Sequence, residues 1–93
     1  MGWIEPSLDL LRSRRVVECR NGERYMVVGD LLMNFDGYNF KNRYDNDLCM
    51  PCSPEFDIMK IFELVETFNS VNTLKHKCCD GVEYPVVMVW RRE

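Results

Sequence analysis

The stretch VVECRNGERYMVV, residues 16–28, carries the strongest structural signal in the sequence. Asn21-Gly22 at its centre supplies the residue types that adopt the two positive φ angles of a type I′ turn, a tight connection between antiparallel strands. The apolar positions that alternate along the two arms are Val17, Cys19, Tyr25 and Val27. This pattern predicts a β-hairpin with one buried face.

Outward from this hairpin, further turns and strands follow. Asp36-Gly37 lies between two apolar runs and predicts a second hairpin. Asp80-Gly81 predicts another turn before the β-forming segment 83–92, in which Pro85 predicts an edge position. On the N-terminal side, Ser7 precedes the segment LDLLRSR and predicts a short capped helix.

Residues 56–68 fit two descriptions. Their apolar residues lie near helical spacing after Ser53-Pro54, yet residues 58–64 also alternate as a strand with two buried faces would. Periodicity alone leaves both open.

The chain as a whole predicts one small α+β domain spanning residues 1–93. No linker, repeat or low-complexity segment divides it. Four or five strands in so short a chain predict a strongly curved antiparallel sheet or a small barrel beside the short N-terminal helix. No apolar run is long enough to span a membrane, and residues 1–15 do not resemble a signal peptide, so we expect a cytoplasmic protein.

Five cysteines are many for 93 residues, and four of them form two close pairs. Cys49 and Cys52 are two residues apart in a polar loop, and His76 stands in the same spacing before Cys79, with Cys78 beside it. Two such chelating turns favour one tetrahedral ion, and mixed sulfur and nitrogen ligands favour zinc. The sequence therefore predicts a structural zinc site that staples the fold, with ligands drawn from Cys49, Cys52, His76, Cys78 and Cys79.

Alternatives to this site stay open. Cys78 can replace either His76 or Cys79, and Cys19 is either a further ligand or a buried thiol. All five thiols can also be buried or idle. A redox dithiol at Cys49 and Cys52 is a third possibility, but the βαβ context of such sites is missing.

Charge is distributed unevenly along the chain. Residues 12–24 carry five arginines against two glutamates, whereas residues 25–70 carry eight carboxylates against three basic side chains. The acidic middle can face a basic partner, or it can be an ordinary solvated surface. The net charge of −3 speaks against direct binding of nucleic acid.

No catalytic motif is recognisable. The sequence contains no nucleophile motif, phosphate-binding loop or dinucleotide fingerprint, and its single histidine is already a candidate metal ligand. We therefore expect a protein that binds a partner and is not an enzyme.

Four segments together resemble a group of small proteins encoded by phages and prophages of Gram-positive bacteria. They are LRSRRVVECRNGERYMVV (11–28), YDNDL (44–48), EFDIMKIFEL (55–64) and VVMVWRRE (86–93). The resemblance covers most of residues 8–92. It implies an SH3-like small barrel in which residues 57–64 form a strand.

The cysteine-bearing version in this chain resembles small type II anti-CRISPR inhibitors, although its cysteines are additions to the group's pattern. That resemblance implies a protein that binds the type II CRISPR effector nuclease and blocks the nuclease from engaging its target DNA. The nuclease holds nucleic acid in positively charged channels. An acidic patch would then dock there, formed by Asp36, Asp45, Asp47, Glu55 and Asp57. The rival hypotheses are a nucleic-acid-binding barrel that uses residues Arg12–Arg24, and a phage accessory or morphogenesis protein.

Overall fold

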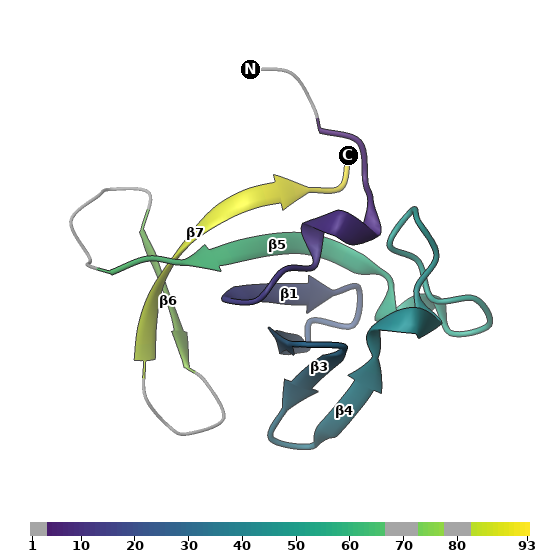
Figure 1. Ribbon diagram of the computed structural model, residues 1–93, viewed down its shortest axis with the longest axis horizontal. Helices are drawn as coiled ribbons and strands as arrows, with labels where there is room; N and C mark the ends of the chain where they lie inside the picture. Colours follow the sequence, from purple (N-terminus) through teal and green to yellow (C-terminus); the bar gives the residue numbers. More distant parts are fainter. Residues whose placement is uncertain (1–3, 67–72, 78–82) are drawn as a thin grey trace.

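Seven strands pair into one antiparallel sheet in the computed structural model, which describes residues 4–66, 73–77 and 83–93 (Figure 1). The strands are β1 (Arg15–Cys19), β2 (Arg24–Val28), β3 (Leu31–Asn34), β4 (Gly37–Phe40), β5 (Ile58–Leu64), β6 (Leu74–Lys77) and β7 (Glu83–Arg91). Their order across the sheet is β4-β3-β2-β1-β5-β7-β6. Three short 3-10 turns accompany them, η1 (Leu8–Leu10), η2 (Lys41–Arg43) and η3 (Pro54–Phe56). Consecutive hairpins build one half of the sheet, and β5 returns to the free side of β1.

The hairpin predicted for residues 16–28 is confirmed as β1 and β2, with Val17 opposite Tyr25. Its turn is not type I′, because only Gly22 has a positive φ angle, of 87°. The Gly22 N–H donates to the carbonyl of Cys19 over 2.9 Å. Arg20 and Asn21 instead donate their N–H groups to carbonyls of residues 55–57, and these contacts hold the turn in a wider form.

The second hairpin is also confirmed, as β3 and β4. Its turn residues are Phe35 and Asp36, and the Asn34 side-chain oxygen accepts the N–H groups of Asp36 and Gly37 over 2.9 and 3.1 Å. The predicted turn at Asp80-Gly81 lies outside the described residues. The strands on its two sides do pair antiparallel, with Lys77 opposite Glu83.

The ambiguous segment contains a central strand. Residues 58–64 form β5, which pairs with β1 on one side and β7 on the other. Ile61 is buried on one face and Phe62 on the other. This two-sided burial explains why its apolar residues do not follow a simple alternation.

The helical part of the predicted α+β class is smaller than expected. Within the described residues there is no α-helix, and the predicted N-terminal helix is the three-residue turn η1. The Ser7 hydroxyl does accept the Asp9 N–H over 3.2 Å, as the predicted cap requires. The fold is therefore almost entirely β.

The prediction that Pro85 lies at an edge holds for the start of β7 but not for the whole strand. Residues 83–85 pair with β6, while the β5 register ends at Leu64 opposite Val86, and in the sheet order β7 lies between β5 and β6. Pro85 pairs with Lys75, and its carbonyl accepts the N–H of Val65, just past the last paired residue of β5. A proline is tolerated here because its missing N–H lies where the β5 ladder has already ended.

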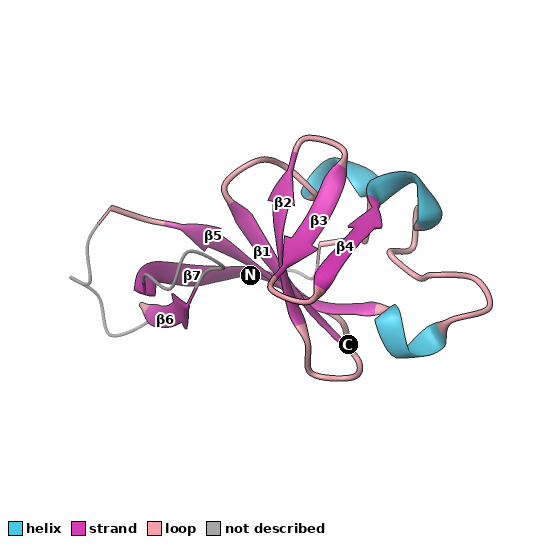
Figure 2. Cartoon of the chain, turned by 90° about the horizontal axis from the view of Figure 1, so that it is seen from below, coloured by secondary structure: helices cyan, strands magenta, loops and turns pink. Residues whose placement is uncertain are grey.

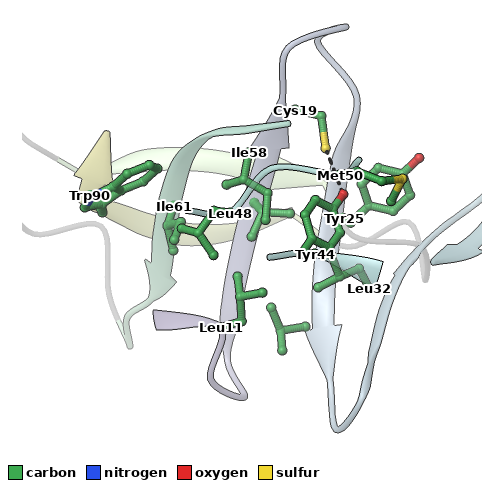
Figure 3. Close-up of a cluster of buried hydrophobic side chains, with 12 residues drawn as sticks. Leu11, Cys19, Tyr25, Leu32, Tyr44, Leu48, Met50, Ile58, Ile61 and Trp90 are labelled. Carbon is green, nitrogen blue, oxygen red and sulfur yellow. Dashed lines mark hydrogen bonds between the residues drawn. The ribbon is translucent and has the colours of Figure 1, made fainter. Parts of the chain in front are cut away.

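The main core lies on one face of the sheet, where side chains of β1, β2, β3 and β5 meet the loop between η2 and β5 (Figure 3). Leu48 and Met50 of that loop are buried against Ile58 and Ile61. The loop thus acts as a second layer over the sheet.

A smaller cluster lies on the opposite face, around Val16, Phe62 and Val86. The β6 residues His76 and Lys77 line the same groove as Met26 and Met33 of the β2–β3 pair, so the sheet curves back across this face. Bulges at Met59 in β5 and Val89 in β7 add to the twist seen in Figure 2. Strands β4 and β6 remain separate edges, so the described strands form a curved sheet and not a closed barrel.

Candidate protein-binding surface

The predicted zinc ligands Cys49 and Cys52 lie in the loop between η2 and β5. Cys49 is half-buried and Cys52 is exposed with a positive φ angle of 67°. Desolvation raises the pKa of the Cys49 thiol, against the opposing effect of the Arg92 charge. The Cys49 thiol contacts the carbonyl of Asp47 at 3.7 Å.

His76 is not brought together with these cysteines. It lies on β6 opposite Tyr84, near the start of β7. The cysteine loop lies at the other end of β7, where Arg92 donates to the carbonyl of Asp47 over 2.7 Å. Seven residues lie between Tyr84 and Arg92, a chain length of roughly 25 Å when extended. Within the part of the chain that the structure describes, Cys49, Cys52 and His76 do not form a group that could hold one metal ion, and Cys78 and Cys79 lie outside the described residues.

Cys19 is a buried thiol of the main core. Only 2% of its surface is exposed, and its sulfur lies 3.9 Å from the Tyr44 hydroxyl. Desolvation raises the pKa of Cys19 to about 11, and the Tyr44 contact opposes the rise. Of the two alternatives for Cys19, the structure shows the buried thiol. Within the described residues no group of three or more histidine, cysteine or acidic side chains could hold a metal ion.

The predicted acidic patch is divided. Asp57 is 7% exposed, and its carboxylate accepts the Met50 N–H over 2.9 Å and contacts Arg20 at 3.4 Å, so this residue has a structural role. Asp45 is exposed, but its Oδ1 accepts two N–H groups of its own loop. Asp47 and Glu55 are exposed in the same region, whereas Asp36 lies at the tip of the β3–β4 hairpin.

Most arginines of the basic stretch are engaged inside the protein. Arg15 is buried and donates to the carbonyl of Leu10 over 3.0 Å. Arg24 donates to Glu18 over 3.0 Å and lies 5.2 Å from the ring centre of Phe62. Arg20 contacts Asp57, as above. These contacts engage three of the five guanidinium groups of the stretch, whereas Arg12 and Arg14 are exposed.

A surface that the sequence did not single out lies on the β3–β4 hairpin. Phe35, Tyr38 and Phe40 are 69%, 57% and 49% exposed. The rings of Tyr38 and Phe40 meet edge to face with their centres 5.5 Å apart. Exposed aromatic side chains gathered at one place are typical of protein-binding surfaces.

This aromatic cluster continues into a groove of about 400 Å³. Met33 is the neighbour of Tyr38 across the β3–β4 pair, and Met26 is the neighbour of Met33 across β2–β3. Both methionines line the groove together with Phe35. We define the hairpin face as these five residues, Met26, Met33, Phe35, Tyr38 and Phe40. The rim of the groove is charged: Glu23 and Asp36 are negative, and Arg24 and Lys77 are positive.

The signal for this face was present but weak. Phe35 and Tyr38 stand on the two sides of the predicted turn Asp36-Gly37. Turns lie at the protein surface, so aromatic side chains beside one tend to be exposed. In a small domain rich in aromatic residues, however, the sequence alone favours burial of most of them.

The described residues include no helix that is long and apolar enough to cross a membrane. Comparisons of the chain with protein families, with curated proteins and with solved structures gave no match.

Proposed function

We propose that the chain is a protein-binding module that acts as an inhibitor of a type II CRISPR effector nuclease and is not an enzyme. The observation that supports a binding role is the hairpin face, an exposed aromatic surface that continues into a groove lined by Met26 and Met33 and by charged side chains. The resemblance of four sequence segments to small phage proteins, and of this cysteine-bearing version to type II anti-CRISPR inhibitors, supplies the class of partner. It also implies an SH3-like barrel; the described strands share a run of four hairpin-connected strands and the return of β5 to β1, but they form an open, curved sheet.

The proposed mechanism is occlusion. The hairpin face supplies the apolar contact, in which Tyr38 and Phe35 are the expected anchors because large aromatic side chains dominate binding energies. Asp36 at its rim, with Asp47 and Glu55 on the loop beyond η2, supplies negative charge. Such charge steers the chain toward a basic channel that otherwise holds DNA.

The arginine contacts support a protein partner over nucleic acid. A chain that bound DNA through residues 12–24 would need those guanidinium groups free, and three of them are paired internally. Binding to DNA or RNA that weakens steeply with salt would favour the nucleic-acid alternative.

The deciding experiment is DNA cleavage by a panel of type II CRISPR nucleases, with the chain added before the target DNA. We expect inhibition near a one-to-one ratio, and a loss of roughly tenfold or more in potency for Phe35→Ala or Tyr38→Ala. Ile4→Ala is the matched control, since Ile4 is 52% exposed and lies outside the hairpin face. No inhibition across the panel would overturn the proposal that the nuclease is the partner. Inhibition that is unchanged in both aromatic variants would overturn the proposal that the hairpin face is the binding surface.

A second arm tests the charges. Asp47→Lys and Glu55→Lys should weaken inhibition more at low salt than at high salt, because exposed charges act mainly through screened, long-range attraction. Asp45 is left intact, because its carboxylate holds the loop. Unchanged inhibition in both variants would show that these two carboxylates do not contribute to inhibition.

A further inference from the structure

Strand β4 forms one edge of the sheet and is open to pairing. It is the last strand in the order, and among the described strands it pairs with β3 alone. The Lys41 N–H donates to the carbonyl of Asp30 over 2.8 Å, which fixes the phase of the β3–β4 ladder. Because hydrogen-bonded pairs alternate in an antiparallel ladder, Asn39 and Gly37 also point their backbone groups toward β3. The N–H and C=O groups of Tyr38 and Phe40 therefore point away from the sheet.

This edge lacks most of the features that usually prevent pairing. Natural edge strands are protected by being very short, by proline, by bulges or by charged side chains within the strand, and of these β4 has only its short length. The strand Gly-Tyr-Asn-Phe has no proline and no charge, and its register with β3 runs without a bulge. Figure 2 shows β4 at the rim of the sheet, beside β3.

The charges that flank β4 favour an antiparallel orientation of a partner strand. Asp36 precedes the strand, and Lys41 and Arg43 follow it. None of these three makes an ion pair with another described residue. An antiparallel second β4 would bring the acidic end of each copy beside the basic end of the other, whereas a parallel arrangement would bring like charges together.

We infer that β4 pairs antiparallel with β4 of a second copy, so that the chain forms a two-fold symmetric dimer through a continuous sheet. The outward groups fit a register in which Tyr38 lies opposite Phe40 of the second copy. This register forms a pair of backbone hydrogen bonds at each Tyr38–Phe40 contact and places two aromatic pairs on the sheet face. It also brings Asp36 next to Lys41 and Arg43 of the second copy.

The contact is short, so the dimer should be weak. A four-residue edge lies at the low end of interface sizes, where association is transient. The expected behaviour is a reversible rise in mass between about 10 µM and about 1 mM chain, the range for weak contacts. The inference is independent of the proposed function, because self-association is measured with the chain alone.

Sedimentation equilibrium over that range tests the dimer, and hydrogen exchange tests its geometry. We expect the amides of Tyr38 and Phe40 to exchange more slowly as concentration rises. Tyr38→Lys and Phe40→Lys should each weaken the dimer about tenfold or more, because two like charges then lie as diagonal neighbours across the two-fold axis and one aromatic residue of each pair is lost. Asp36→Lys should weaken it several-fold, and the added changes Lys41→Asp and Arg43→Asp should restore it.

Val28→Lys is the control that separates edge pairing from contact between sheet faces. Val28 is 48% exposed on the same face as Tyr38 but belongs to the internal strand β2. We expect this variant to dimerise like the unmodified chain. A chain that stays monomeric throughout, or a dimer that Val28→Lys weakens as much as Tyr38→Lys does, would overturn the inference. Circular dichroism of every variant checks that the fold is kept.

Discussion

At the scale of single residues, one buried carboxylate fixes the loop that covers the main core. Asp57 accepts the Met50 N–H over 2.9 Å and contacts Arg20 at 3.4 Å. Asp57→Ala would leave the Met50 N–H without its partner, in a region closed to water. Leaving a buried donor unsatisfied costs about 1–3 kcal/mol.

We therefore expect Asp57→Ala to lower the free energy of unfolding by about 1–3 kcal/mol, measured by urea denaturation. Asp36→Ala is the matched control, because Asp36 is exposed and makes no ion pair with another described residue. A loss no larger than that of the control would show that Asp57 is available to a partner, as the sequence had suggested.

Cys19 gives a second prediction at this scale, about alkaline pH. Desolvation in the core raises the pKa of Cys19 from 9.0 to about 11. Because the folded state favours the protonated thiol, the resulting stability is fully present below pH 9 and is lost as the pH rises through about 11. Burial raises the pKa of Tyr25 and Tyr44 in the same direction.

The expected result is a free energy of unfolding that falls between pH 9 and about pH 11, with a smaller fall in Cys19→Ala. At about pH 8, alkylation followed by peptide mapping should modify the exposed Cys52 well before Cys19. Equal rates for these two thiols in the folded protein would contradict the burial of Cys19.

At the scale of elements, the segment after β7 holds the long loop against β5. The Arg92 side chain donates to the carbonyls of Asp47 over 2.7 Å and Ile58 over 2.9 Å, and lies 5.4 Å from the Trp90 ring centre. One guanidinium thus joins three elements that are far apart in sequence. Hydrogen bonds from a charged donor contribute about 1.5–3 kcal/mol.

Arg92→Met keeps most of the side-chain volume and removes these donors. We expect it to lower the free energy of unfolding by about 2 kcal/mol and to speed hydrogen exchange of the Leu48 and Cys49 amides. Arg43→Met is the control, since Arg43 is exposed and has no such contacts. Exchange that is unchanged in Arg92→Met would show that the loop is held by its apolar residues alone.

At the scale of the whole molecule, local signals predicted more than long-range ones. The two hairpins follow from short segments around Asn21-Gly22 and Asp36-Gly37, whose turn chemistry acts over a few residues. The position of His76 relative to Cys49 depends instead on the strand order, which a single sequence does not fix. The hairpin face was missed for a similar reason, because β4 is exposed only by being last in the sheet.

That strand order leads to a prediction about metal. His76 and the loop of Cys49 and Cys52 lie near opposite ends of β7, so we expect that these residues do not share one ion. If the purified chain carries zinc on the cysteine pair, His76→Ala should leave the zinc content and the melting temperature in chelator unchanged. The measurement is metal analysis of protein prepared without added zinc, combined with thermal unfolding.

Lys77→Ala serves as the control for the neighbouring exposed position. A zinc loss in His76→Ala as complete as that in the double variant Cys49→Ser and Cys52→Ser would require both ends of β7 to meet at one site, and would contradict the sheet described for this chain.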